Sequence, residues 1–202
     1  MHGPQPTRIL ILGGGFAGVT VAMELERSLG RDPSVEITLV NRENFFLFTP
    51  MLHEVAASDL DLTTIVNPVR KLLRRVQFFA GEVDRIDLEQ RNVSVAHGFD
   101  HHQHTLGFDF LVLGLGSVTN FYGIPGLAER ALTMKSLGDA IRLRNHLIAQ
   151  LEEADNECCK VKEPLVTFVV LPASRLWRQS TTSCGVRCIP TRTWRRTCCV
   201  SF

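Results

Sequence analysis

A short apolar run that passes directly into a glycine-rich turn constrains the fold of this chain more than any other feature. Residues 9–12 (Ile-Leu-Ile-Leu) contain no polar side chain, which predicts a strand that is buried on both faces. Gly13, Gly15 and Gly18 follow at once. A helical pattern comes next and is expected to stop at Gly30, and its expected apolar face consists of Ala17, Val21, Leu25 and Leu29.

This order of strand, glycine turn and helix is the context that a dinucleotide-binding turn requires. Gly13 permits the tight turn, Gly15 leaves room for a pyrophosphate to approach the backbone, and Gly18 allows the helix to pack closely on the strand. The free N–H groups and the positive end of the helix dipole then face the phosphates. The alternative is a glycine turn with a purely structural role.

The residue after the second strand is unusual for such a unit. A strand over residues 35–40 completes a βαβ start, which predicts an α/β fold with a parallel sheet. An acidic residue usually follows this strand and hydrogen-bonds the ribose. Here the residue is Asn41, which can bond ribose hydroxyls without charge or be a simple turn residue. Arg42 could instead attract a 2′-phosphate, so NADP is a minor alternative.

The remaining elements are expected from apolar patterning and turn residues. Short helices are expected over residues 51–57 and 63–75, with Pro68 interrupting the second, and a long amphipathic helix over 137–153. Residues 97–105 are polar and are expected to be irregular. Further strands, two of them forming a small β-hairpin insertion, are expected over residues 76–80, 83–88, 93–96, 108–113 and 165–170.

Several segments resemble one family when they are taken together. They are Gly13 to Gly18, Phe46 to Leu52, Asp109 to Ser117, Asn120 to Gly126, and Lys135 to Ala140 with Arg142 to Arg144. The combination is similar to type II NADH dehydrogenases, single-subunit flavoproteins that pass electrons from NADH to a membrane quinone without pumping protons. The resemblance covers about residues 8–170. It implies a Rossmann-like FAD-binding domain of the flavoprotein superfamily with two dinucleotide-binding domains, and FAD rather than NADH at the first glycine turn.

The resemblance also implies a role for particular residues. Asn41 and Arg42 would lie at the adenosine ribose, and Val83 would present its backbone to the adenine. Thr49, Pro50 and Leu52 would approach the isoalloxazine, with Leu115 and Gly116 also close to the flavin. The FAD pyrophosphate would be surrounded by Gly13, Gly14, Gly15, Phe16, Ala17 and Gly18. Alternatively, the nearby phenylalanines are simply core residues, namely Phe45, Phe46 and Phe48.

No catalytic side chain and no metal are expected. The flavin performs the hydride transfer, and the protein positions it. Disulfide-reductase relatives carry a redox cysteine pair beside the flavin, whereas the first cysteine here is Cys158, so another electron acceptor is implied. A polar cluster is expected to be a solvated loop (Asp100, His101, His102 and His104), and four cysteines lack a standard zinc spacing (Cys184, Cys188, Cys198 and Cys199).

Composition limits the expected partners and location. The net charge of +1 gives no sign of a nucleic-acid partner, and no apolar run reaches the length of a membrane-spanning helix. Residues 1–7 lack the pattern of a secretory signal. The resemblance implies NADH and quinone as partners of the intact protein, a cytoplasmic location peripheral to the inner face of the membrane through a C-terminal region, and a homodimer as one option.

The last part of the chain departs from the family. A second glycine-rich turn, close to Gly-Gly-Gly-Phe-Ala-Gly-Val-Glu-Thr, is expected after Val170, but Pro172 follows and the next glycine is Gly185. Residues 171–202 contain six arginines, no acidic residue, both tryptophans and four of the six cysteines. We therefore expect a truncated protein: an FAD-binding domain over 1–163, the first strand of an NADH-binding domain over 164–170, and a disordered basic tail over 171–202.

The genetic code suggests an origin for this tail. In a shifted reading frame, the codons of residues 172–179 can encode Gly-Phe-Ala-x-Val-Glu-Thr, which is the missing motif. Our hypothesis is that the residues from about 171 are translated out of frame, and the alternative is a natural basic tail. In either case the chain lacks the NADH site and is expected to be inactive. The other readings are an FAD- and NAD(P)-dependent oxidoreductase with a different acceptor, or a non-catalytic flavin-binding fragment.

The hypothesis predicts the coding DNA around Val170. Sequencing should find that the alternative frame continues through Gly-Phe-Ala-x-Val-Glu-Thr into a long open frame. An early stop codon in that frame would show instead that the basic tail is genuine.

Overall fold

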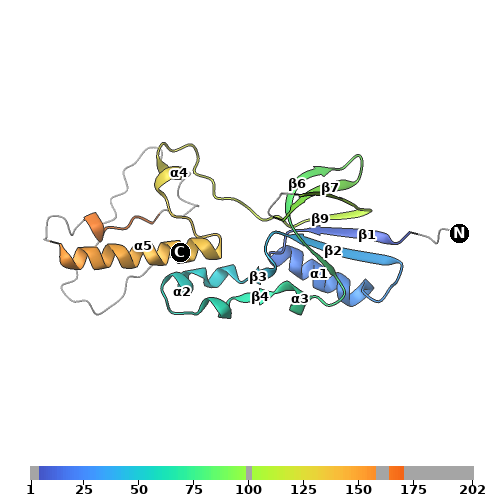
Figure 1. Ribbon diagram of the computed structural model, residues 1–202, viewed down its shortest axis with the longest axis horizontal. Helices are drawn as coiled ribbons and strands as arrows, with labels where there is room; N and C mark the ends of the chain where they lie inside the picture. Colours follow the sequence, from blue (N-terminus) through green and yellow to red (C-terminus); the bar gives the residue numbers. More distant parts are fainter. Residues whose placement is uncertain (1–4, 99–101, 158–163, 171–202) are drawn as a thin grey trace. The chain divides into compact units, whose positions relative to one another are not determined.

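The computed structural model describes residues 5–98, 102–157 and 164–170 (Figure 1). The chain divides into two compact units, one of residues 1–119 and 133–141 and the other of residues 120–132 and 142–202. The predictions for Asp100, His101, Cys158, Cys159 and residues 171–202 lie outside the described residues. Nothing in the structure tests the predicted domain boundaries, which stay a prediction.

A parallel four-stranded sheet forms the centre of the first unit. Its order is β5-β2-β1-β9, and every neighbouring pair is parallel. Ile9 lies opposite Ile37 on one side and opposite Phe110 on the other. The α/β fold and the βαβ start are thereby confirmed. The four strands are β1 (Thr7–Leu12), β2 (Val35–Asn41), β5 (Gln77–Ala80) and β9 (Phe110–Leu113).

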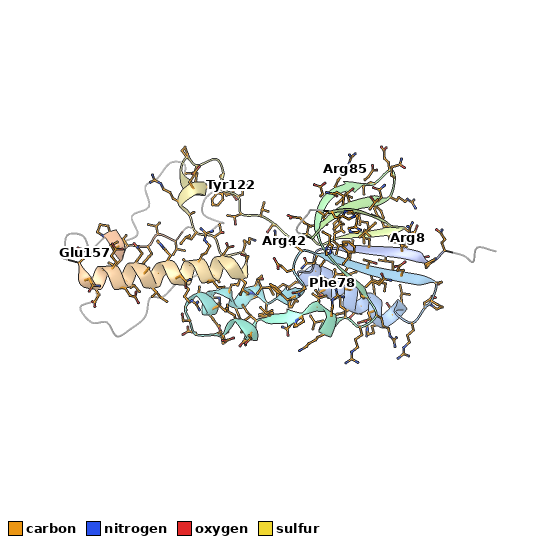
Figure 2. The ribbon with its side chains drawn as sticks, in the orientation of Figure 1. Arg8, Arg42, Phe78, Arg85, Tyr122 and Glu157 are labelled. Atoms are coloured by element: carbon orange, nitrogen blue, oxygen red, sulfur yellow. The ribbon has the colours of Figure 1, made fainter. Side chains whose placement is uncertain are left out.

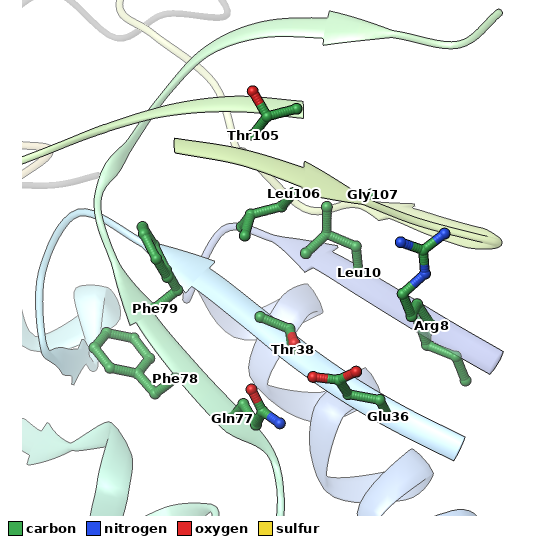
Figure 3. A pocket seen from close by; sticks show the side chains of 11 residues that line it. Arg8, Leu10, Glu36, Thr38, Gln77, Phe78, Phe79, Thr105, Leu106 and Gly107 are labelled. Atoms are coloured by element: carbon green, nitrogen blue, oxygen red, sulfur yellow. The ribbon is translucent and has the colours of Figure 1, made fainter. Parts of the chain in front are cut away.

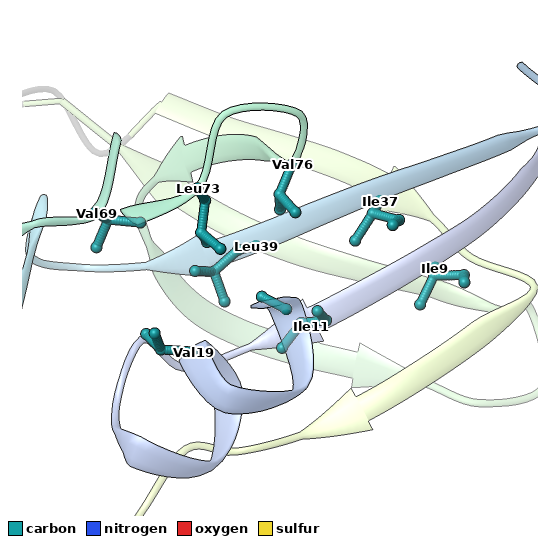
Figure 4. Close-up of a cluster of buried hydrophobic side chains, with 9 residues drawn as sticks. Ile9, Ile11, Val19, Ile37, Leu39, Val69, Leu73 and Val76 are labelled. Carbon is teal, nitrogen blue, oxygen red and sulfur yellow. The ribbon is translucent and has the colours of Figure 1, made fainter. Parts of the chain in front are cut away.

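The two faces of this sheet are covered by different elements. Helix α1 (Phe16–Leu29) covers one face, and Ile9 and Ile11 of β1 belong to the hydrophobic cluster on that side (Figure 4). An antiparallel three-stranded sheet covers the other face, where Leu10 and Leu12 belong to a second cluster with Val93 and Val95. Alternate side chains of β1 therefore enter two cores, which explains its uninterrupted apolar sequence. The antiparallel strands are β6 (Glu82–Asp87), β7 (Asn92–His97) and β8 (His102–Gly107).

Helix α1 has its predicted length but not its predicted rotation. It ends at Leu29 and is capped by Gly30, as expected. Ala17, however, is exposed, while Gly18, Val19 and Ala22 are the buried residues. The predicted face was wrong at its start because the close contact of Gly18 with Gly13 sets the rotation of the helix. The later residues Val21, Leu25 and Leu29 are partly buried, as the pattern suggested.

The segment between β2 and β5 contains a strand pair in place of the second predicted helix. Strand β3 (Phe45–Leu47) pairs antiparallel with β4 (Val66–Pro68), and Phe45 lies opposite Pro68. The prediction of a helix over 63–75 was therefore wrong except for the α-helical turn over 69–72, since β3 provides a partner that local patterning does not reveal. The predicted helix after Pro50 is confirmed. The short helices here are η1 (Thr49–Met51), α2 (Leu52–Ala56), η2 (Leu62–Thr64) and α3 (Val69–Leu72).

Two further corrections concern β8 and β9. The hairpin of β6 and β7 is confirmed, but the segment 97–105 is not all irregular, because β8 pairs along the whole of β7, from Asn92–Gly107 to His97–His102. Strand β9 is shorter than the predicted buried strand 108–113 and lies at the sheet edge. Phe110 and Leu113 are 62% and 63% exposed, because β9 has a neighbour on one side only.

Hydrogen bonds at the start of β9 and of helix α5 (Leu137–Asn156) fix both elements. The backbone N–H of Arg8 donates to the carboxylate of Asp109 over 2.8 Å and lowers the pKa of that carboxyl. Burial tends to raise the pKa of Asp139, but hydrogen bonds from the Lys135 and Ser136 N–H groups outweigh it and the pKa is lowered. The helix is confirmed and is slightly longer than predicted.

The second unit contains α4 (Leu127–Arg130) and the greater part of α5. Gly123 and Gly126 both have positive φ angles, of 66° and 75°, which confirms the predicted turn. The predicted strand over 165–170 was wrong: residues 167–170 have no regular structure, and Val169 and Val170 are exposed. Apolar residues form a strand only beside a partner, and none of the described strands pairs with them. Among the described residues, no helix is both long and apolar enough to span a bilayer.

Candidate functional site

Three connections meet at the carboxyl edge of the parallel sheet. The Gly13 N–H donates to the Val40 carbonyl over 2.8 Å, and the Gly114 N–H donates to the Leu12 carbonyl over 2.7 Å. The Gly81 N–H donates to the Asn41 carbonyl over 3.0 Å. Backbone bonds thus join the turns after β1, β5 and β9 to this edge. Ligands of open α/β sheets bind there, outside the carboxyl ends of the strands.

The predicted roles of the first glycines agree with their geometry. Gly13 has a φ angle of +99°, and a Cβ atom there would lie 2.2 Å from the Gly114 carbonyl oxygen. A Cβ atom on Gly18 would lie 1.8 Å from the Gly13 carbonyl oxygen. At Gly15, by contrast, a Cβ atom would meet no atom within 4 Å. Gly13 and Gly18 are therefore required by the fold, whereas Gly15 borders open space.

The amino terminus of α1 beside this open space has the character of an anion site. Its N-cap residue is Gly15, no side chain caps it, and its first turn contains no acidic residue. The first N–H groups of a helix have no partner within the helix, and the helix dipole adds positive potential there. Phosphate groups bind at such termini. The residues present therefore fit the pyrophosphate of a dinucleotide.

Asn41 is fixed by the protein at both ends of its side-chain amide. Its Oδ1 atom accepts the Gly14 N–H over 2.8 Å, and its Nδ2 group donates to the Glu43 carbonyl over 2.7 Å. The amide lies so close to the turn that a Cβ atom on Gly14 would be 2.7 Å from Asn41 Cγ. This contact explains why position 14 is glycine, which the sequence alone did not explain.

Arg42 lies beside Asn41 at the end of β2, between two carboxylates (Figure 2). Its Nε atom is 3.5 Å from Glu43 Oε1, and its Nη1 atom is 3.9 Å from Glu82 Oε1. All three side chains are more than half exposed, so these ion pairs are weak. A 2′-phosphate would nevertheless face two carboxylates as well as the arginine, which disfavours the NADP alternative.

An aromatic cluster adjoins the start of α1. The Phe16 ring lies edge-on to Phe46 and Phe48, with ring centroids 5.0 Å and 5.5 Å away. The cluster brings the segment of Thr49 and Pro50, both exposed, towards the glycine turn. Phe46 also packs against the core, as expected for a core residue. A role of these phenylalanines at a flavin stays a prediction. Leu52 is only 2% exposed, so its side chain packs inside the protein and does not face a ligand.

The remaining predicted site residues lie on two other segments. Val83 is on β6, an edge strand, and pairs with Val95 next to an irregularity in the register. Leu115 is 56% exposed, and Gly116 has a φ angle of +78° with open space around its Cβ position. Among the described residues, no hydrogen bond or ring contact joins Val83 to the glycine turn.

Sequence reasoning missed Gly114 as a site residue. A Cβ atom there would lie 3.1 Å from the Leu12 carbonyl oxygen and 3.2 Å from the Gly18 nitrogen. Gly114 therefore permits the end of β9 to lie against the glycine turn. The sequence feature that could have identified Gly114 is the pair of glycines in Gly114-Leu115-Gly116, directly after a predicted strand.

A groove in the first unit lies elsewhere (Figure 3). It has a volume of about 220 Å³ and is lined by Arg8 and Glu36 near the amino ends of β1 and β2, by Phe79 of β5 and by Leu106 of β8. It lies between the two sheets at the edge opposite the glycine turn. Nothing about it indicates a ligand, and we place the candidate site at the carboxyl edge.

The histidines of β8 do not form a metal site with their neighbours. His102 and His104 have ring centroids 4.9 Å apart, and His104 also packs edge-on against Phe79 at 5.3 Å. No group of three or more potential ligands (His, Cys, Asp or Glu) in the described ranges could hold a metal ion. His102 and His104, which were predicted to lie in a solvated loop, therefore lie on a paired strand and pack on aromatic rings.

Comparison with known proteins identifies the family. The profile of the pyridine nucleotide-disulphide oxidoreductases matches residues 7–159, which include every element of the candidate site. The chain belongs to this family. The only cysteines in the matched range are Cys158 and Cys159, at its end.

Similar proteins include several quinone reductases. The chain is 33% identical to the type II NADH:quinone oxidoreductase Ndh of Mycobacterium tuberculosis over 175 residues, which are 84% of this chain and 36% of that protein. It is 36% identical to the demethylphylloquinone reductase NdbB of Synechocystis over 158 residues, 76% of this chain and 38% of that protein. These relatives confirm the resemblance to type II NADH dehydrogenases. The chain spans about a third of their length.

The fold is also similar to solved structures. NDH2 from Plasmodium falciparum, in complex with RYL-552, superposes with a TM-score of 0.71 and 22% sequence identity. The similarity covers 79% of this chain and 32% of that one. It confirms the predicted fold class for the described residues.

The glycine geometry predicts opposite effects for two substitutions. Gly18→Ala should lower the free energy of unfolding by about 3 kcal/mol or more, because its methyl group would overlap the Gly13 carbonyl. Gly15→Ser should stay within about 0.5 kcal/mol of the wild type, because serine is a good N-cap residue and meets open space. Urea unfolding followed by circular dichroism measures both. Equal losses of stability would contradict the distinction between the two glycines.

Proposed function

We propose that this chain is the FAD-binding part of a flavoprotein of the NADH:quinone oxidoreductase type. The observation that carries the proposal is the start of α1, an uncapped helix terminus without acidic residues that opens at Gly15 onto free space. The family match and the quinone-reductase relatives support the same conclusion. FAD, when bound, would accept a hydride from NADH and pass electrons to a quinone.

The residues of this chain would bind and orient the cofactor. The backbone N–H groups of Phe16, Ala17 and Gly18 are placed to donate to the pyrophosphate, while Gly13 and Gly14 hold the turn in shape. Asn41 and Arg42 would lie near the adenosine ribose, and the backbone of Val83 near the adenine. On the flavin side, exposed Thr49 and Pro50 and the segment Leu115–Gly116 would limit the space for the ring. Leu52 would contribute by fixing α2 rather than by direct contact.

Hydride transfer would need no acid or base from these residues. The task of the protein is to hold the reacting ring, orient it and exclude competing acceptors. In the intact protein NADH and quinone would be the partners, at the inner face of the cell membrane and with a homodimer as one option. A different electron acceptor remains the alternative within the same family.

A non-catalytic flavin-binding fragment is a second candidate for the chain as given. One observation favours it: no glycine-rich turn follows Val170 in the sequence, where the resemblance places the NADH-binding turn. We propose that residues 164–170 belong to the start of an NADH-binding domain and that the chain has no complete NADH site.

The proposed cofactor predicts that the purified 202-residue chain retains or rebinds FAD. Gly15→Ser should bind FAD at least about tenfold more weakly, a loss of about 1.4 kcal/mol, because its side chain occupies the space for the pyrophosphate. Titration followed by quenching of flavin fluorescence measures both affinities. The Gly15→Ser variant keeps the fold, so unchanged affinity would rule out this turn as the FAD site.

The incomplete NADH site predicts very little activity. NADH-dependent reduction of a soluble quinone by the FAD-loaded chain should stay at the rate of free FAD, because no second nucleotide site holds the NADH. A rate of one turnover per second or more, roughly the lower end for ordinary enzymes, would overturn this expectation.

A further inference from the structure

Asn41 stands at a position where the acidic residue of a dinucleotide-binding unit usually contacts the ribose, but it is engaged differently here. Its side chain bonds Gly14 and Glu43, and its own carbonyl accepts the Gly81 N–H. We call Asn41 with these three partners the Asn41 brace. The brace joins the turn after β1, the loop after β2 and the turn after β5.

We propose that Asn41 is a positioning residue whose amide donor holds the carboxyl edge in shape, and that this chain therefore excludes the usual acid at position 41. The proposal rests on the proposed function only for its effect on FAD. Its structural part concerns the protein alone and can be tested without a cofactor.

The chemistry of the two side-chain bonds carries the argument. One end of the amide must accept a hydrogen bond from Gly14, and the other end must donate one to the Glu43 carbonyl. Asparagine has both functions on one rigid group, whereas an ionised aspartate can only accept. In Asn41→Asp, the second carboxylate oxygen would face the Glu43 carbonyl oxygen across the distance of a hydrogen bond. Only the protonated acid could replace both bonds.

The charges around the brace determine how such an acid would titrate. Glu43 and Glu82 lie on the loop after β2 and at the start of β6, and each is within 4 Å of Arg42, the nearest cation. From β7, the His97 ring hydrogen-bonds the carbonyl of Ala80, which is paired with Asn41 in the sheet. The first turn of α1 contributes no acidic residue. The Glu43 carbonyl and the two carboxylates oppose an ionised aspartate at position 41, whereas the Gly14 N–H, Arg42 and the positive end of α1 favour it.

An ionised aspartate at position 41 keeps an acceptor for the Gly14 N–H but loses the donor to the Glu43 carbonyl. The brace therefore predicts that Asn41→Asp is less stable and binds FAD more weakly at pH 8. A residue that contacts the ribose directly predicts the opposite, because an ionised carboxylate accepts ribose hydroxyl bonds more strongly than an amide.

Asn41→Asp is the test, with Asn44→Asp as the matched control. Asn44 is exposed and lies three residues further along the chain. Its side chain makes no hydrogen bond to any of the described residues, so its substitution adds the same charge without touching the brace. We expect Asn41→Asp to bind FAD at least tenfold more weakly than the control at pH 8. Its melting temperature without FAD should be lower than that of the control at the same pH.

Each outcome decides the proposal. Tighter or unchanged FAD binding by Asn41→Asp at pH 8 would make Asn41 a ribose ligand and overturn the proposal. If both variants bound FAD equally weakly, the added charge alone would explain the loss of affinity, and the proposal would be overturned as well. If the wild type bound no FAD, the proposed function would fail, but the melting temperatures would still decide whether the brace exists.

A measurement on the wild type covers the case in which Asn41→Asp does not fold. The Gly14 amide proton and one Nδ2 proton of Asn41 should exchange slowly with solvent in NMR spectra, because both are hydrogen-bonded in the brace. Rapid exchange of both in the folded protein would overturn the proposal.

Discussion

The close packing of three glycine backbones is the constraint on which the first unit depends. Gly13, Gly18 and Gly114 lie so near one another that a methyl group on Gly13 or Gly18 would overlap a carbonyl group. This contact sets the rotation of α1, which directs Val19 and Ala22 into the core and leaves Gly15 beside open space. It also holds the end of β9 against the turn. The same packing therefore determines both the hydrophobic core and the shape of the anion site.

Backbone groups, rather than charged side chains, provide the chemistry of this site. The helix terminus offers N–H groups, Asn41 is neutral, and Arg42 is balanced by Glu43 and Glu82. Backbone donors cannot move away as a long side chain can, so their direction depends on how firmly the turns are held. Bonds from Asn41 to three separate connections provide that support. A neutral residue at this position is thus consistent with the site, although the sequence pattern alone suggests a weakened ribose contact.

The sequence predicted those parts of the fold that local signals determine. The apolar run of β1, the glycines after it and the second strand predicted the βαβ start, which the structure confirms. They also indicated a dinucleotide site, which stays a prediction. Prediction from the sequence failed where a residue's structure depends on a distant partner. Residues 66–68 form β4 because they pair with β3, and residues 102–107 form β8 because they pair with β7. The brace was missed for the same reason, since Asn41 and Gly14 are 27 residues apart. The face of α1 was misjudged because periodicity gives the spacing of apolar residues but not the glycine contact that rotates the helix.

The open edge of the parallel sheet connects stability to binding. Phe110 and Leu113 of β9 are mostly exposed, and no described strand pairs with the outer side of β9, so the described residues leave apolar surface and unpaired backbone groups at this edge. Such a unit has a smaller margin of stability than one with a closed sheet. A ligand that binds only the folded state adds to that margin, by about 2.7 kcal/mol at a concentration one hundred times its Kd. Because Gly13, Gly114 and Asn41 hold both the sheet end and the proposed cofactor site, occupation of that site and folding of the first unit are one coupled equilibrium.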